Sequence, residues 1–120
     1  MEIRELLEIQ RKFDHDHGWG TEKTNPEERL NAMEKDIIGL IGEVGEAANC
    51  LKKVRLHLDA GRDAQKIYDV EAPHLREELI DAFIYLIRLI DLAGTDLEKE
   101  YLAKLVNNRE RYIEFEKTDH

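Results

Sequence analysis

The segment between Pro73 and Gly94 constrains this chain more than any other, because it is apolar on almost every side at helical spacing. A helix of this kind in a water-soluble protein has to be covered by several neighbours. A chain of 120 residues offers few such neighbours. We therefore expect a homo-oligomer, a dimer or a tetramer, whose interface includes this segment. Its apolar residues are Leu79, Ile80, Ala82, Phe83, Ile84, Leu86, Ile87, Leu89, Ile90 and Leu92.

Two helices are predicted before this segment. The first spans about residues 2–14 and is followed by a polar loop that contains Trp19. The second has a clear start, because Asn25 can cap it and Pro26 suits the first helical position. Gly61 is a plausible stop for it. The residues expected to face its core are Ile37, Leu40, Ile41, Val44, Ala47, Ala48, Leu51 and Val54.

A fourth helix is predicted after Gly94, with Thr95 and Glu98 in the positions of a capping box. Its apolar residues follow helical spacing, and no part of the chain alternates as a strand would. We expect an all-α fold in which residues 1–120 form one domain. The protomer should resemble a four-helix bundle and assemble into a dimer or tetramer.

The composition excludes several classes of protein. A net charge of −9 argues against binding a nucleic acid polymer, which requires clustered Lys and Arg. Charged residues interrupt every apolar stretch before the roughly 18 positions that a membrane span needs. Cys50 is the only cysteine, so an intrachain disulfide is impossible and a cysteine-based metal site is disfavoured. The first residues lack the order of a signal peptide, and a cytoplasmic location is expected.

Four carboxylates stand out within the two central helices. Glu43 and Glu46 are three residues apart on the second helix, and Glu78 and Asp81 repeat this spacing on the third. Residues at this spacing project from the same side of a helix. Asp81 lies among leucines and isoleucines, where an isolated carboxylate is costly unless it is paired, protonated or bound to a cation. The two pairs are therefore predicted to converge on one site.

Oxygen donors without histidine or thiolate favour Mg²⁺, with Mn²⁺ as a possible substitute, over zinc. Two other interpretations remain open from the residues alone. The acidic pairs could be surface charges of a non-catalytic helical oligomerisation module. They could also belong to a di-iron carboxylate bundle, although such bundles usually pair Glu with a His three residues on, which neither pair here does.

Gly39, Gly42 and Gly45 recur every three residues around Glu43, and each costs helix stability of about 1 kcal/mol relative to alanine. They either let another backbone approach closely or leave room for a ligand beside the carboxylates. Close packing is the preferred interpretation.

The two acidic stretches resemble those of the MazG-like, all-α nucleotide pyrophosphohydrolases, a superfamily that includes dCTP pyrophosphatases and dimeric dUTPases. The hallmark of that family is a Glu-x-x-Glu helix, followed by a Glu-x-x-Asp helix and then by a basic stretch. These elements correspond here to residues 42–48, 77–86 and 104–112. The resemblance implies Mg²⁺-dependent hydrolysis of a nucleoside triphosphate between its α and β phosphates, with the clearance of unwanted nucleotides as its expected role.

The resemblance also implies roles for individual residues. Glu43, Glu46, Glu78 and Asp81 match the metal ligands, and Glu46 is the preferred general base. Lys104, Asn108 and Arg111 share one side of the fourth helix and would hold phosphate and sugar. Lys53 is a further candidate for phosphate contact.

Recognition of the base is where the chain departs from the family pattern. The dCTP-specific relatives carry an aromatic residue near the position of Lys53, and none is present here. Stacking would have to come from elsewhere, and Trp19 or Phe13 in the first loop region is the candidate. The preferred base is therefore left open.

Overall fold

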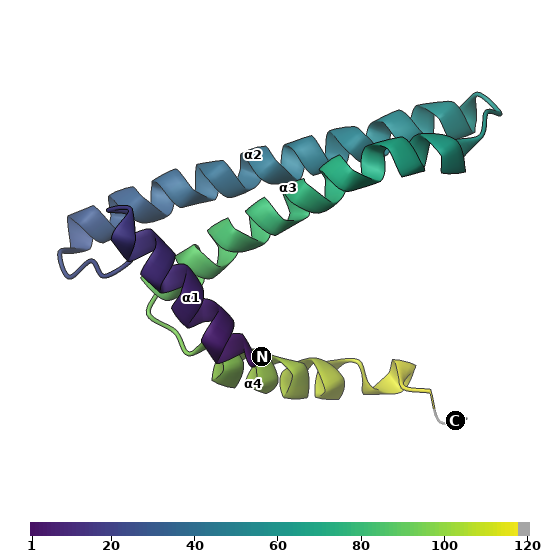
Figure 1. The fold of residues 1–120 in the computed structure, drawn as a ribbon. Helices are drawn as coiled ribbons and strands as arrows, with labels where there is room; N and C mark the ends of the chain where they lie inside the picture. Colours follow the sequence, from purple (N-terminus) through teal and green to yellow (C-terminus); the bar gives the residue numbers. More distant parts are fainter. Residues whose placement is uncertain (118–120) are drawn as a thin grey trace.

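The computed structural model describes residues 1–117, which form four α-helices and one short 3₁₀ turn (Figure 1). This confirms the predicted all-α fold, since the described residues contain no strand. None of the described helices is both long and apolar enough to cross a membrane. The helices are α1 (Ile3–Asp16), α2 (Pro26–Asp59), α3 (Ala64–Leu92) and α4 (Leu97–Arg111), followed by the 3₁₀ turn Ile113–Phe115.

Local signals place most of the helix ends. Asn25 caps α2, and its side chain accepts hydrogen bonds from the backbone N–H of Glu27 and Glu28, as predicted. Gly94 follows α3 with a φ of 74°, a conformation that favours glycine. The cap of α4 differs from the prediction by one residue. Asp96, not Thr95, accepts the hydrogen bond from the N–H of Lys99, because its carboxylate is a strong acceptor at a helix N-terminus.

The start of α3 was predicted wrongly. The helix begins at Ala64 and continues through Pro73, which lies inside it. A proline within a helix costs about 3 kcal/mol because it removes one hydrogen bond and crowds the preceding turn. The helix packs against α2 on both sides of Pro73, since Glu71 pairs with Lys53 at 3.7 Å and Leu75 belongs to the buried cluster with Ala47 and Cys50. Tertiary contacts thus override the local signal.

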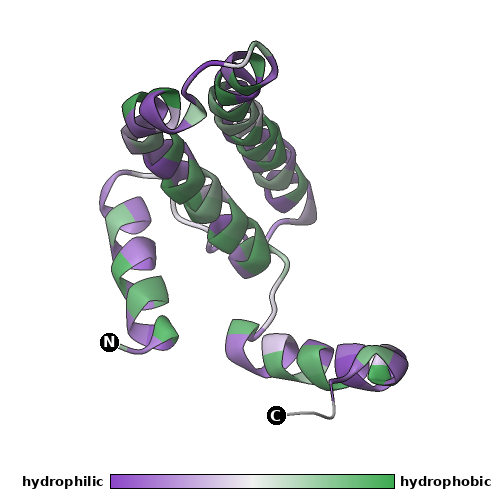
Figure 2. Cartoon of the chain, turned by 90° about the vertical axis from the view of Figure 1, so that its right-hand side faces the viewer, coloured by the Kyte–Doolittle hydropathy of each residue, from purple (hydrophilic) through white to green (hydrophobic). Residues whose placement is uncertain are grey.

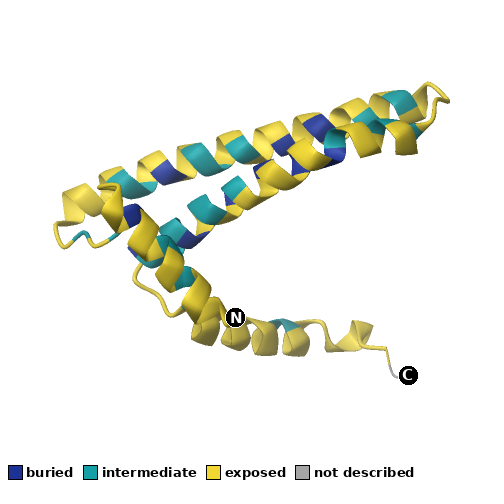
Figure 3. Ribbon diagram, in the orientation of Figure 1, coloured by how far each residue is buried: buried dark blue, intermediate teal, exposed yellow. Residues whose placement is uncertain are grey.

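The antiparallel pair of α2 and α3 forms the centre of the fold. Asp36 lies opposite Arg88, Gly39 opposite Tyr85, and Lys53 opposite Glu71. The covered residues of α2 alternate in steps of four and three, a spacing that also describes the seam of a coiled coil. Figure 3 shows the buried positions on the facing sides of the two helices. The covered positions are Asp36, Leu40, Glu43, Ala47, Cys50 and Val54 on α2, and Glu71, Leu75, Glu78, Ala82, Tyr85, Leu89 and Leu92 on α3.

A second apolar stripe follows each of these helices, one position after the covered residues. One residue corresponds to a rotation of about 100° around a helix. Because the two helices are antiparallel, the same rotation turns both stripes to one side of the hairpin. We call this side the apolar face. It comprises Ile37, Ile41, Val44, Ala48 and Leu51 on α2, and Leu79, Phe83 and Leu86 on α3, all of which are exposed.

The core predicted for α2 combined residues of the covered stripe with residues of the apolar face. Leu40, Ala47 and Val54 lie on the covered side, as expected. The other members of the set belong to the apolar face, and Ile41 for example is 65% exposed. The error has a physical reason: both stripes are apolar and adjacent, so periodicity alone reads them as one broad side.

The opposite side of the hairpin carries charged and polar residues, one position before the covered ones. The same rotation argument places the stripes of α2 and α3 on one side, which we call the polar face. Two of the four predicted metal ligands belong to it. The polar face includes Glu46, Asn49 and Lys53 on α2, and His74, Glu77, Asp81 and Arg88 on α3, while Val70 and Ile84 are apolar residues at the same step.

The four helices do not close into a bundle within one protomer. Only α2 and α3 pack along their length, while α4 runs apart from the hairpin in both views (Figures 1 and 2). The radius of gyration is 18.7 Å, whereas a compact chain of this length has about 14 Å. The apolar residues of α4 are exposed, and the bundle that the sequence predicts is therefore left incomplete.

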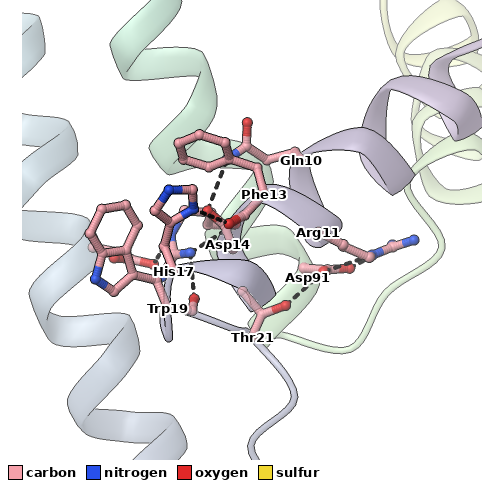
Figure 4. A network of polar contacts seen from close by, with 10 residues as sticks. Gln10, Arg11, Phe13, Asp14, His17, Trp19, Thr21 and Asp91 are labelled. Atoms are coloured by element: carbon pink, nitrogen blue, oxygen red, sulfur yellow. Dashed lines mark hydrogen bonds and ion pairs between the residues drawn. The ribbon is translucent and has the colours of Figure 1, made fainter.

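Charged contacts hold α1 against the end of the hairpin. Arg88 contacts Asp14 at 2.9 Å and Asp36 at 3.0 Å, and both carboxylates are buried. Arg88 also donates to the carbonyl of Trp19 at 2.7 Å. A second set joins Arg11 to Asp91 through two hydrogen bonds (Figure 4). The bidentate geometry fixes the orientation of α1 relative to α3.

Two glycines of α2 allow a paired test of this packing. A Cβ at Gly39 would clash with the ring of Tyr85, whereas a Cβ at Gly42 meets nothing within 4 Å. We expect Gly39→Ala to destabilise the protein and Gly42→Ala to stabilise it by up to about 1 kcal/mol, the gain in helix propensity. Urea unfolding followed by circular dichroism measures both. A destabilised Gly42→Ala would instead show that something covers this position in solution.

Candidate metal centre

The antiparallel register brings the two predicted acidic pairs together. Ligand atoms of Glu43, Glu78 and Asp81 all lie within 4.8 Å of one another. Glu46 lies within the same distance of Glu78 and of His74. Glu78 belongs to both groups, so its carboxyl group is the centre of the cluster. The predicted convergence of the four carboxylates is thus seen in the structure.

Glu78 is the buried member of this cluster. Its exposed fraction is 5%, and its Oε2 has no hydrogen-bond partner among the described residues. The groups around it are carboxylates, which accept hydrogen bonds and cannot donate when ionised. Contact with Glu43, then burial, then contact with Glu46 raise the pKa of Glu78 to about 8. Without a cation, this site favours a protonated Glu78.

The sequence had pointed to Asp81 as the carboxylate with the least access to water. The structure gives that place to Glu78 and leaves Asp81 half-buried. The reason is the direction in which each residue points from α3. Glu78 occupies the seam against α2, whereas Asp81 lies three residues further on and belongs to the polar face.

The donor set fits a divalent cation. Several carboxylate oxygens surround one buried oxygen that lacks a partner, and a positive charge there would remove both the repulsion and the unsatisfied acceptor. Hard oxygen donors of this kind are those that Mg²⁺ and Mn²⁺ prefer. Among the described residues, no lysine or arginine forms an ion pair with any of the four carboxylates.

His74 is a member of the site that the sequence analysis missed. Its Nε2 lies 3.6 Å from Oε1 of Glu78, and it shares a group with Glu46. A signal was available, since His74 and Glu78 are four residues apart and therefore neighbours on one side of α3. A helix that began at Pro73 would have placed His74 in its first turn, whereas α3 begins at Ala64 and His74 lies well inside it.

The sequence analysis offered two explanations for the glycines beside the cluster, close packing or room for a ligand, and different glycines fit each of them. Gly39 permits a close approach, although by the side chain of Tyr85 and not by a backbone. Gly42 and Gly45 face open space and help to line a hollow beside Glu46. Asn49 and Lys52 continue the lining. The hollow is lined by α2 alone, and Glu46 is the one carboxylate of the cluster that reaches it.

The other predicted site residues lie in two separate parts of the structure, the hairpin and α4. Lys53 lies two turns beyond Glu46 on the polar face and pairs with Glu71 of α3. Lys104, Asn108 and Arg111 lie on α4, apart from the hairpin of their own protomer (Figure 1).

Trp19 lies at the hairpin end that carries α1. Its carbonyl accepts from Arg88, which shares the polar face with Asp81 and follows it by two helical turns. Figure 4 shows the rings of Phe13, His17 and Trp19 gathered beside this network. The rings of His17 and Trp19 are stacked with centroids 5.2 Å apart, and Trp19 is 55% exposed. An exposed aromatic surface thus lies at the hairpin end near Arg88, two helical turns along α3 from Asp81.

Comparison with known proteins finds one weak similarity. The rat (Rattus norvegicus) protein dCTP pyrophosphatase 1 is 27% identical to this chain over 110 residues. The match covers 92% of the chain, so it includes both carboxylate-bearing helices, but the chain spans only 58% of the length of that relative. No protein-family profile matches the chain. No solved structure matches it either.

The pKa of Glu78 generates a test of the cluster. Between pH 4.5 and about 8 the unfolded chain has lost the Glu78 proton while the folded chain retains it, so stability should fall as the pH rises. We expect the melting temperature in EDTA to decrease over this range. Glu78→Gln should flatten the slope, because glutamine does not titrate.

Two controls accompany this measurement. Glu34→Gln removes an exposed carboxylate of α2 outside the cluster and should leave the slope unchanged. Millimolar Mg²⁺ should raise the melting temperature most at the upper end of the range, where the ligands are ionised. If the melting temperature falls equally with pH in the wild type and in Glu78→Gln, the folded chain does not retain a proton on Glu78 over this range.

Proposed function

We propose that this chain is a MazG-like nucleoside triphosphate pyrophosphohydrolase that uses a divalent metal ion, Mg²⁺ or Mn²⁺. The observation that carries the proposal is the buried Glu78, whose unpartnered oxygen lies among carboxylates from two helices. An ion pair or a hydrogen bond would satisfy a purely structural glutamate, and neither is formed with Oε2 by any described residue. The similarity to dCTP pyrophosphatase 1 supports the same class of reaction.

In the proposed reaction, water attacks the α-phosphorus and the bond from that phosphorus to the α–β bridging oxygen breaks. The products are a nucleoside monophosphate and pyrophosphate. Bound Mg²⁺ would neutralise the polyphosphate and lower the pKa of the attacking water. Glu46 is the candidate for accepting the proton from that water, since it is exposed and lies beside the open hollow. Glu43, Glu78 and Asp81 complete the ligand set.

The base would lie towards α1. Trp19 is the candidate stacking partner, and the contact of its carbonyl with Arg88, which holds the loop beside α3, supports this role. Asp36 and Asp14 hold Arg88 in place and thereby orient the loop. Lys53 lies on the same face at the other side of the carboxylates, where it would contact phosphate.

The proposal includes a second copy of the chain, which would cover the apolar face and supply residues of α4 to the site. The apolar face and the apolar residues of α4 are exposed in one protomer, and burying them needs a partner. Lys104, Asn108 and Arg111 would then serve the carboxylates of the second copy, since α4 leaves its own hairpin. The assembly would be a dimer or a tetramer.

Release of pyrophosphate from a panel of nucleoside triphosphates tests the activity. With Mg²⁺ we expect turnover of at least one of them, and a loss of at least ~10²-fold in kcat for Glu43→Gln, Glu78→Gln and Asp81→Asn. Glu34→Gln serves as the matched control and should retain full activity, because its exposed side chain lies on α2 outside the cluster. No turnover of any triphosphate, with carboxylate variants that alter only the oligomeric state, would indicate a helical assembly module instead.

Mixing inactive variants tests the contribution of the second copy. Glu78→Gln and Arg111→Ala, refolded together, should recover about a quarter of wild-type activity in a dimer with shared sites. Each mixed dimer then has one site in which both parts are intact. A mixture of Glu78→Gln and Glu43→Gln is the control and should stay inactive, since both residues belong to the same hairpin. Failure of the first mixture to recover would mean that α4 acts on its own protomer.

A further inference from the structure

The cluster contains two overlapping groups of ligands and not one. Glu43 and Asp81 meet Glu78 in an all-carboxylate group. Glu46 meets Glu78 in a second group, whose third member is His74. The ligand atoms of each group lie within 4.8 Å of one another. Glu78 thus has a group on each side, and two cation positions can share it.

The spacing between His74 and Glu78 suits a shared ion better than a direct bond. Nε2 of His74 and Oε1 of Glu78 are 3.6 Å apart, which exceeds the roughly 3.2 Å limit of an N–H···O hydrogen bond. Two donors that each bind one ion at about 2.1 Å lie approximately 3 to 4.2 Å apart. The observed distance falls within that interval without movement of either side chain.

A second observation points to a ligand at Glu78, the residue that both groups share. The carboxyl group of Glu78 is more than nine-tenths buried, and its Oε2 lacks a partner among the described residues. His74 has no other ion-pair or hydrogen-bond partner in the part of the chain that the structure describes. About half of its side chain is exposed, so an ion from solvent can reach it. His74 is therefore accessible to an ion from solvent, and Glu78 has an oxygen atom that lacks a hydrogen-bond partner.

Imidazole changes which ion the second group prefers. Mg²⁺ strongly favours oxygen ligands, whereas first-row transition ions gain affinity from a nitrogen donor. We propose that His74 is a metal ligand and that Glu46, His74 and Glu78 form a second cation position, selective for Mn²⁺ or Co²⁺ over Mg²⁺. The all-carboxylate group beside it takes the hard ion. This inference rests on the metal centre of the proposed function and not on the identity of its substrate.

Binding of Mn²⁺ to the full-length chain, stripped of metal, tests the proposal without any nucleotide. Free Mn²⁺ is followed by electron paramagnetic resonance in the presence of excess Mg²⁺, which fills the all-carboxylate position. The wild type should retain one Mn²⁺ per chain. His74→Gln should lose roughly 10- to 100-fold in Mn²⁺ affinity, with little change in Mg²⁺ affinity.

Two further variants make the test specific. His57→Gln removes a histidine of α2 outside the cluster and should bind Mn²⁺ as the wild type does. His74→Glu replaces nitrogen with oxygen, so we expect it to keep an ion at this position but to lose the preference for Mn²⁺. With Co²⁺, the visible absorption of the wild type should change in His74→Gln and not in His57→Gln. Circular dichroism verifies that each variant is folded.

The outcomes separate this inference from the proposed function. Equal Mn²⁺ affinity in the wild type and His74→Gln would overturn the inference and leave His74 as a simple neighbour of Glu78 on α3. Pyrophosphate release with Mg²⁺ alone would still stand in that case. Absence of any divalent-ion binding by the wild type would overturn both.

Discussion

The structure depends on a narrow seam between α2 and α3 that is only partly apolar. Small residues such as Ala47 and Cys50 let the helices approach, and Leu75 joins them in the one buried apolar cluster of the described residues. Glu78 lies in the same seam, one turn away. A carboxyl group at such a position opposes packing unless it is protonated or bound to a cation. Formation of the hairpin and formation of the acidic cluster are therefore the same event.

Each central helix carries three stripes of residues, and each stripe has a different role in the hairpin. The middle stripe holds α2 and α3 together. The stripe before it is the polar face with candidate metal ligands, and the stripe after it is apolar and exposed. Because the helices are antiparallel, each outer stripe meets its counterpart on one side. In the proposed assembly the apolar face would be buried against a second copy, while the polar face, with Glu46 and His74, would receive the substrate and α4 of the second copy. Burial of apolar surface and ligand binding would thus use opposite sides of the hairpin.

The sequence predicted the parts of this arrangement that local signals encode. Helix types, the Asn25 cap and the pairing of Glu43 and Glu46 with Glu78 and Asp81 follow from spacing and side-chain chemistry. The continuation of α3 through Pro73 did not follow, because packing outweighs the local preference. Nor did the position of His74, which depends on the register between helices. Periodicity shows that a helix has an apolar side, but it does not show whether that side meets this chain or another copy.

The contact between Arg88 and the carbonyl of Trp19 gives the protein an internal optical reporter. Trp19 is the only tryptophan of the chain, and its indole stacks on His17 beside the ion pairs that join α1 to the hairpin. Loss of these ion pairs would release the loop and change the surroundings of the ring. The intrinsic fluorescence of the unlabelled protein therefore reports the docking of α1, independently of the helix content that α2 and α3 dominate.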